Sequence, residues 1–340
     1  MKYRVVVAGA FKYPIYQEAL SEGIEKIGNT VYRIKLKDDS PYNIRLSICN
    51  GKILIKELEK IRPDILFLYR VENLLPCYVR KLRESYPKMV IMQYHNDDPF
   101  RIGFKRYIKS YQYLHYIKYT DITYVYRPIN INEAKRWGVK QSKLYMSHYY
   151  TKTDFKELNR NDCLNKNGKV VFLGHWENDD RIEYIRECYR QGINLHIYGP
   201  DNWHYVFVKY NLPLENLHPS VRGEEYIRVI HDSSIALAFF SKANRDEYTR
   251  RCYEIPIAGT VLLQPSTIIT REIFKDGVDA ILYDNVEDFV NKVKYLLGNQ
   301  EKLTEVAYNG YCLMKNGPFS ENARAQMVID DYEQIIKSRK

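Results

Sequence analysis

Apolar and polar positions in the first half of the chain fall into alternating blocks of strand and helix length. Short apolar runs, typical of buried strands, occur at residues 3–8, 31–36, 65–69, 88–94 and 121–126. Apolar residues at helical spacing lie between these runs, at residues 15–27, 53–61 and 78–86. Strands that alternate with helices form parallel sheets covered by helices on both faces. We therefore expect the first half to be an α/β domain.

A polar stretch at residues 151–168, rich in Lys, Asp, Asn and Thr, predicts a link between two domains. The alternation restarts after it, with strands expected at 169–173, 194–198, 235–240, 261–263 and 279–283 and helices at 181–191, 224–231 and 272–275. The whole pattern predicts two Rossmann-like parallel-sheet domains, residues 1–155 and 165–318, facing each other across a cleft. Ligands of such sheets bind beyond the carboxyl ends of the strands.

Composition narrows the class of protein. The chain has 340 residues, of which 45% are hydrophobic, which is enough for two cores. No apolar run approaches the ~20 residues of a membrane-spanning helix. The N-terminus enters a strand-like run and lacks the features of a signal peptide. We therefore expect a cytoplasmic protein, and we expect its six cysteines, which form no CxxC pair, to be reduced.

The net charge of +10 is compatible with a nucleic acid, an anionic membrane or a merely solvated basic surface. Lys and Tyr interleave over residues 105–119, and a helix there would put Tyr107, Tyr111, Leu114 and Lys118 on one face. Such a face suits peripheral contact with the inner face of a membrane, or tyrosines packed inward. No nucleic-acid-binding motif accompanies the charge, so we expect no nucleic-acid partner.

Several catalytic motifs are missing from the sequence. The loop after the first strand, Ala8-Gly9-Ala10, lacks the glycines of a GxGxxG fingerprint, and there is no P-loop. This argues against an NAD enzyme or an NTPase. The chain also has no GxSxG elbow and no HExxH motif, so common hydrolase classes receive no support.

The segment His95-Asn96-Asp97-Asp98 follows a predicted strand. A histidine and two carboxylates at a strand end can orient hydroxyls or relay a proton. Adjacent acids can also bind a divalent cation, although two neighbours in one loop are weak support for a metal site. The alternative is structural, with one Asp capping a helix and His95 as an ordinary hydrogen-bonded side chain.

The loop after the first strand of the second domain begins Gly174-His175-Trp176 and leads to Arg181. A glycine lets a diphosphate approach the backbone, and an arginine can pair with phosphate oxygens. Arg181 could equally be a solvated residue at a helix start. Gly199 ends the next predicted strand in the same way.

The segment from Arg251 to Gly259 places an acid, Glu254, just ahead of the small-residue turn Ala258-Gly259. Arg251 and Glu254 are three residues apart and so share a helix face. This is the setting of a polar ligand clamp, or of a structural ion pair. Asp246, eight residues before Glu254, is either a second ligand-binding acid or a helix cap.

The second half resembles the CgeB-like glycosyltransferases, relatives of the large retaining glycosyltransferase group with the GT-B fold. The resemblance rests on Phe172-Leu173-Gly174, on residues 195–199 with Trp203, on residues 226–237, on residues 251–259 and on residues 274–284. It implies that the pair Asp246-x7-Glu254 corresponds to the E-x7-E pair of the family. In that pair one acid faces the donor sugar and the other binds the ribose. It also implies that a final helix, residues 319–340, crosses back to the first domain.

On this resemblance, Glu254 binds the ribose and Arg251 contacts the diphosphate, while the strand end at His95 faces the donor sugar. The catalytic residues expected are His95, Asp98 and Asp246. The donor-binding residues expected are Gly174, Arg181, Tyr198, Gly199, Arg251, Glu254, Ala258 and Gly259.

The expected activity is transfer of a sugar, hexosyl-like and retaining, from a nucleotide-sugar donor to a surface-glycan or lipid-linked acceptor. No metal or other cofactor is expected. Two alternatives stay open: a sugar-nucleotide epimerase of the same fold, and a non-catalytic protein that binds an anionic ligand or a membrane. Retention of configuration is what the resemblance implies. The sequence itself leaves open the base, the sugar, the acceptor, retention against inversion and the oligomeric state.

Overall fold

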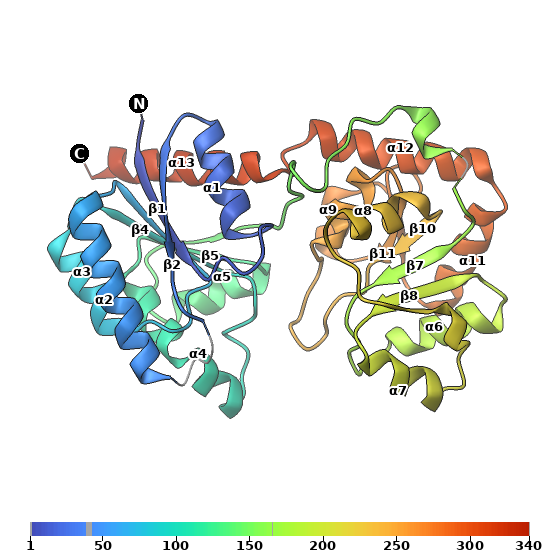
Figure 1. Ribbon diagram of the computed structural model, residues 1–340, viewed down its shortest axis with the longest axis horizontal. Coiled ribbons are helices and arrows are strands. Elements are labelled where there is room, and N and C mark those ends of the chain that lie inside the picture. The colour runs from blue at the N-terminus through green and yellow to red at the C-terminus, as the bar shows by residue number, and fades with distance from the viewer. Residues whose placement is uncertain (1, 39–42, 165, 340) are drawn as a thin grey trace. The chain divides into compact units, whose positions relative to one another are not determined.

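The computed structural model describes residues 2–38, 43–164 and 166–339. The chain divides into two compact units, one formed by residues 1–146 with 321–340 and the other by residues 147–320. Each unit contains one six-stranded sheet whose strands pair in parallel (Figure 1). The α/β class predicted from the sequence is therefore confirmed.

The sheet of the N-terminal unit has the strand order β2-β1-β3-β4-β5-β6. Its strands are β1 (Arg4–Gly9), β2 (Thr30–Lys35), β3 (Ile65–Tyr69), β4 (Val90–His95), β5 (Ile122–Val125) and β6 (Ser142–Leu144). Its helices are α1 (Gln17–Lys26), α2 (Ile44–Ile61), α3 (Pro76–Ser85), α4 (Phe104–Tyr116), η1 (Ile117–Tyr119), α5 (Pro128–Lys135) and α13 (Glu321–Ser338). β1, β3 and β4 are almost wholly buried, because apolar side chains on both faces of a central parallel strand meet helices.

The last helix of the chain, α13, packs on the N-terminal unit. Its buried Asp331 accepts a hydrogen bond of 2.7 Å from the Tyr124 hydroxyl of β5 and pairs with Lys143 of β6. The Tyr332 ring lies 4.8 Å from the Tyr3 ring, and Glu321 pairs with Lys26 at 3.0 Å. A segment at the end of the sequence thus completes a core built from the beginning.

The sheet of the C-terminal unit has the strand order β12-β11-β10-β7-β8-β9. Its strands are β7 (Val170–Leu173), β8 (Leu195–Gly199), β9 (Leu217–Pro219), β10 (Ile235–Leu237), β11 (Val261–Pro265) and β12 (Ile281–Tyr283). Its helices are η2 (Arg160–Cys163), α6 (Arg181–Arg190), α7 (Asn202–Lys209), η3 (Leu214–Asn216), α8 (Gly223–Asp232), α9 (Arg251–Ile257), α10 (Ile268–Ile273), α11 (Val286–Leu297) and α12 (Gln300–Asn316).

Both sheets have a topological switch point. At this point two neighbouring strands are followed by connections that run to opposite sides of the sheet. In the N-terminal unit it lies between β1 and β3, and in the C-terminal unit between β7 and β10. Loops diverge at such a point and leave room for a ligand beyond the carboxyl ends of the strands. These two positions are therefore where candidate residues are best sought.

Several expectations from the sequence need correction. α2 begins at Ile44 rather than Ile53, α10 ends at Ile273 instead of beginning near it, and β10 ends at Leu237. In α4, Leu114 is buried rather than sharing an exposed face with Tyr107 and Tyr111.

Two other expectations concern cysteines and membrane spans. The six cysteines are free, as expected. Among the residues the structure describes, no helix has both the length and the apolar character needed to cross a bilayer.

Candidate functional site

The first candidate site begins at Gly174, directly after β7 and at the switch point of the second sheet. The Gly174 N–H donates to Tyr198 O at 2.9 Å, and its carbonyl accepts a 2.8 Å hydrogen bond from the Trp203 indole. A Cβ at this position would lie 2.7 Å from Nη2 of Arg251. Gly174 is therefore a place where only a glycine lets a guanidinium lie against the backbone.

Arg251 is held firmly at the carboxyl end of β7. Its Nε donates to Leu173 O at 2.5 Å, and its guanidinium lies over the Phe172 ring, 5.5 Å from the centroid. The side chain is half-buried, so one part of the guanidinium is fixed by the protein while another part is still accessible. A cation fixed in this way can pair with the oxygens of a phosphate or diphosphate.

Glu254 lies one helical turn after Arg251 and is 6% exposed. One of its carboxylate oxygens pairs with Arg250, and the other accepts a 3.1 Å hydrogen bond from the Tyr226 hydroxyl. Arg250 also pairs with the buried Asp154. Burial raises the pKa of Tyr226, which keeps its hydroxyl protonated and able to donate. Each carboxylate oxygen has a second lone pair, so Glu254 can still accept hydrogen bonds from ligand hydroxyls.

Three members of this cluster were not predicted from the sequence: Arg250, Tyr226 and Asp154. Arg250 had a usable signal, because it precedes Glu254 by four residues and the two face each other on one helix. Tyr226 reaches the cluster from α8, and Asp154 from the segment before η2. Only the fold brings these two residues to Glu254.

Arg181 was predicted to contact the donor, and the structure gives its guanidinium a different environment. It is 4% exposed, its Nε and Nη2 bind Asp179 at 2.7 and 2.8 Å, and its Nη1 donates to His175 O at 2.7 Å. These bonds organise the loop that follows Gly174. Contact of Arg181 with a donor stays a prediction.

The other predicted donor residues are not all brought together. Tyr198, the residue before the end of β8, accepts the hydrogen bond from the Gly174 N–H, and its ring stacks on His218 with centroids 4.5 Å apart. Asp246 lies half-buried in the loop after β10, on the same edge of the sheet. Ala258 and Gly259, by contrast, precede β11 and so lie at the opposite edge, where Gly259 has a φ of 72°. The structure does not bring these two residues to Gly174.

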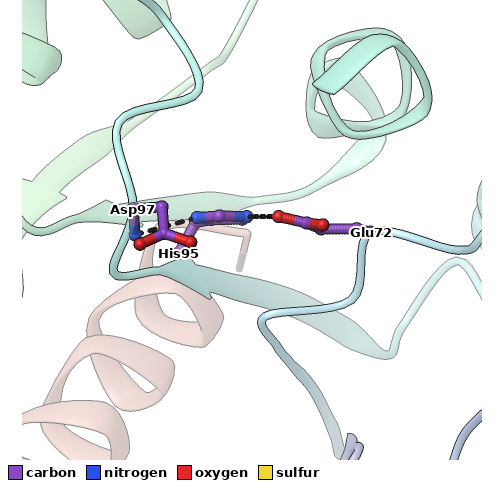
Figure 2. A group of neighbouring side chains, drawn as sticks. All are labelled: Glu72, His95 and Asp97. Carbon is purple, nitrogen blue, oxygen red and sulfur yellow. Dashed lines mark hydrogen bonds and ion pairs between the residues drawn. The ribbon is translucent and has the colours of Figure 1, made fainter. Parts of the chain in front are cut away.

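The second candidate site lies next to the switch point of the first sheet, at the carboxyl ends of β3 and β4, around His95. The His95 Nε2 atom lies 3.0 Å from Oε1 of Glu72, and the backbone N–H of Asp97 donates to Nδ1 at 3.1 Å (Figure 2). Nδ1 therefore acts as the acceptor and Nε2 as the donor toward Glu72. Asp97 in turn pairs with Arg70 at 2.9 Å. Four residues from the ends of β3 and β4 thus form one hydrogen-bonded chain.

The charges of this chain of residues support one another. Burial opposes ionisation of Glu72, but the hydrogen bond from His95 and the nearby charges of Lys109 and Arg70 outweigh it, so the pKa of Glu72 is lowered. Burial likewise opposes ionisation of Asp97, and Arg70 is the first of several cations that lower its pKa nonetheless. Both acids are therefore carboxylates at neutral pH.

Asp98, predicted to be catalytic, is 1% exposed and accepts a 3.0 Å hydrogen bond from Asn130 of α5. Asp97 has the more accessible side chain, 33% exposed, and it is the acid that joins the His95 network. Sequence reasoning missed Glu72 and Arg70, because both follow a different strand, β3. The parallel pairing of β3 with β4 brings them beside His95.

Glu72, His95 and Asp97 also form a possible metal-ligand set, with ligand atoms all within 4.8 Å of one another in the part of the chain that the structure describes. The hydrogen bonds of these residues argue against metal binding. The His95 Nε2 atom faces a carboxylate as a donor, and Asp97 is paired with Arg70. Arg70 and Lys109 also bring positive charge close to the site. The set fits an ion-pair network better than a cation site.

Comparison with protein-family models gives one match. Residues 181–330 match a family described as glycosyl transferase-like. They make up less than half of the chain, and they contain Arg251 and Glu254 but not Gly174. A search of curated protein sequences found no match.

Solved structures with the same fold cover nearly the whole chain. A sucrose-phosphate synthase from Thermosynechococcus elongatus is 12% identical with a TM-score of 0.74, covering 99% of this chain and 100% of that one. HepE from Anabaena in complex with UDP is 9% identical with a TM-score of 0.67, covering 98% and 100%. A structure described as a UDP-N-acetylglucosamine 2-epimerase from Listeria monocytogenes is 12% identical with a TM-score of 0.63, covering 99% and 98%. These likenesses assign the chain to the GT-B fold.

Proposed function

We propose that the protein is a glycosyltransferase that moves a sugar from a nucleotide-sugar donor to a glycan or lipid-linked acceptor. The observation that carries the proposal is the cluster at the carboxyl end of β7. There Arg251 lies against Gly174 and, one turn further along α9, the acid Glu254 is held by Tyr226 and Arg250. A cation and an acid at this spacing suit the diphosphate and the ribose of one nucleotide. The match of residues 181–330 to a glycosyl transferase-like family supports the same conclusion.

The chemistry we propose is electrostatic. When the bond between sugar and diphosphate breaks, negative charge grows on the leaving diphosphate, and a fixed cation lowers the barrier because it needs no reorganisation. Arg251 takes this role, and Glu254 accepts hydrogen bonds from the ribose hydroxyls. We assign His95, held by Glu72, to the sugar or the acceptor. Retention of configuration, hexose as the transferred sugar and a relation to the CgeB-like group belong to this proposal.

The test is the variant Glu254→Gln, which keeps the size of the side chain and removes its charge. We expect the affinity for a nucleotide donor to fall about tenfold or more, since a charged hydrogen-bond acceptor contributes roughly 1.5–3 kcal/mol. Nucleotides and their sugars are screened by thermal shift and calorimetry, starting with UDP, the ligand in the HepE structure. Glu287→Gln, an exposed acid of the same unit, is the matched control. Unchanged donor affinity and turnover in Glu254→Gln would refute the assignment.

Removal of metal gives a second prediction. Because Arg251 supplies the positive charge, Asp97 is paired with Arg70 and Glu72 is hydrogen-bonded to His95, transfer should continue in excess EDTA at an unchanged rate. Turnover is measured with and without the chelator, and again after Mg²⁺ or Mn²⁺ is added back. A loss that metal restores would instead make Glu72, His95 and Asp97 metal ligands.

A second candidate is a sugar-nucleotide epimerase, because a structure described as such an enzyme has the same fold. It would bind the nucleotide through the same residues, Arg251 and Glu254, but release an isomerised sugar without an acceptor. Product analysis separates the two activities. An isomer formed in the absence of any acceptor favours the epimerase, whereas acceptor-dependent release of nucleoside diphosphate favours the transferase.

A further inference from the structure

Residues 101–111, here called the α4 tip, lead into and begin the helix α4, which is labelled in Figure 1. Their side chains form an exposed apolar surface. Ile102 is 99% exposed and Phe104 78%, the highest values among the exposed large hydrophobic residues that the structure describes. Tyr107 and Tyr111 follow on the same helix, 40% and 47% exposed. Single exposed apolar residues are common, but four within ten positions form a patch, and such patches mark interaction sites.

The opposite side of α4 is fixed in the protein. Tyr113 is 1% exposed, and its hydroxyl accepts a 2.7 Å hydrogen bond from Gln93. The buried Tyr116 donates from its hydroxyl to Val71 O at 2.7 Å, and Gln112 accepts a 2.8 Å hydrogen bond from Ser47. These contacts set the rotation of the helix. Phe104, Tyr107 and Tyr111 therefore cannot turn inward to bury themselves.

Positive charge surrounds this apolar surface. Residues 101–111 include Arg101, Lys105, Arg106 and Lys109 and contain no acidic residue. Lys105 and Lys109 are exposed and four residues apart, so they lie on one side of the first turns of α4, and Phe104, Tyr107 and Tyr111 lie on the other side. The start of the helix therefore presents apolar and basic side chains on opposite sides. A surface that combines aliphatic, aromatic and basic side chains complements the boundary between acyl chains and anionic headgroups.

We propose that the α4 tip is a docking site for an anionic lipid bilayer. Ile102 and Phe104 enter the acyl boundary, Tyr107 and Tyr111 lie at the level of the headgroups, and Lys105 and Lys109 bind lipid phosphates. The interaction is peripheral. It uses other residues than the donor site and stands or falls independently of the proposed transfer reaction.

The experiment is co-sedimentation of the whole protein with two kinds of vesicle, phosphatidylcholine alone and phosphatidylcholine mixed with phosphatidylglycerol. The wild type should bind the mixed vesicles, and added salt should weaken binding by screening the lysines. The double variant Ile102→Ser/Phe104→Ser should reduce partitioning about tenfold or more, and Lys105→Glu several-fold. The matched control is Ile268→Ser/Tyr295→Ser, a pair 63% and 59% exposed on the C-terminal unit.

Two measurements keep the variants interpretable. The substituted side chains are exposed, so the melting temperature and the affinity for nucleotide should equal those of the wild type.

Insertion of the α4 tip is tested separately with a Phe104→Trp variant. It should gain fluorescence that brominated lipids quench, beyond the signal from the native tryptophans. Quenching equal to that of the wild type would argue against insertion.

Three results would overturn the proposal. They are no binding to the mixed vesicles, binding that the tip variants leave unchanged, and equal binding to vesicles without anionic lipid. Light scattering supplies a fourth. If the wild type is an oligomer and the double variant a monomer, the α4 tip is an interface between copies of this chain and not a lipid-docking surface.

Discussion

Glu72 shows how one buried side chain can organise a candidate site. It is 8% exposed and receives its hydrogen bond from Nε2 of His95, while the Asp97 N–H occupies Nδ1. With both ring nitrogens engaged, the imidazole has one orientation and one tautomer. Glu72 therefore acts through His95, as a positioning residue.

The variant Glu72→Gln tests this pairing through its pH dependence. Because the pKa of Glu72 is lowered in the folded protein, its ionised form adds stability above the ordinary carboxyl value of about 4.3. That stability is lost as the pH falls through the lowered pKa. We expect the variant to be about 1–2 kcal/mol less stable than the wild type at neutral pH, and this difference should shrink in acid. Thermal unfolding of both proteins, from neutral pH down to pH values below the carboxyl pKa, measures the difference.

The control for that experiment is Glu84→Gln, an acid 68% exposed on α3 whose nearest cation is 3.8 Å away. It should leave the unfolding temperature nearly unchanged at every pH. A Glu72→Gln protein as stable as the wild type at neutral pH would contradict the role given to Glu72. So would a stability difference that grows as the pH falls.

At the scale of elements, the candidate donor site is a contact between the loop after β7 and the first turn of α9. Arg251 of α9 occupies the space that a side chain on Gly174 would take. Phe172 closes the same space from β7, since its Cζ would lie 2.8 Å from a Cβ on Gly174. The two elements therefore fit together only because this position is a glycine.

The variant Gly174→Ala should displace the Arg251 guanidinium. The new Cβ would meet both the flexible guanidinium and the buried Phe172 ring, so we expect a loss of stability of about 1–3 kcal/mol, as for other overpacked sites. Donor affinity should fall about tenfold or more, because a displaced cation no longer meets the diphosphate. Calorimetry with the nucleotide that binds best measures it. Gly298→Ala, whose new Cβ would approach nothing closer than 3.4 Å, is the control. Unchanged affinity would remove Arg251 from the site.

The sequence predicted elements well where their apolar pattern was continuous. The runs that became β1, β3 and β7 stand out because both faces of these strands are buried. α12 was not predicted, since its buried side includes Thr304, Gly310 and Tyr311 and so breaks the apolar periodicity. The first turns of α2 were missed for a similar reason. The buried Asn50 interrupts the apolar pattern, because its amide donates to the carbonyls of Lys37 and Asn73 outside the helix.

The candidate sites were predictable only in part. Gly174, Arg251, Glu254 and His95 follow strands or share a helix face, so spacing alone singled them out. Tyr226, Asp154 and Glu72 become neighbours of those residues only through strand pairing and helix packing. No local pattern announces such partners, because each comes from a different element.

At the scale of the whole molecule, one of the two units is continuous in sequence and the other is not. Residues 147–320 form one unit without interruption, whereas the other unit needs both ends of the chain. α13 contributes the buried residues Ala325, Val328, Ile329 and Asp331 to that unit. The N-terminal unit is therefore incomplete without the last helix.

A chain that ends at Ser320 tests this dependence. Loss of α13 exposes apolar residues and leaves the buried Tyr124 hydroxyl without its partner, so we expect the N-terminal unit to lose cooperative unfolding. The C-terminal unit should keep its transition, and saturating nucleotide, at ~100 times its Kd, should still stabilise it by about 2.7 kcal/mol. Calorimetry follows both transitions. Gln326→Ala, an exposed change on α13, is the control. Two intact transitions in the truncated chain would contradict the prediction.

The position of α13 also has a consequence for biosynthesis. A nascent chain emerges from the ribosome with its N-terminus first, and domains commonly fold in that order. Here the strands of the first sheet emerge early but must wait for the final helix before their core can close. Residues 147–320 can reach their native structure sooner, so the half of the protein that is translated first is the last to finish folding.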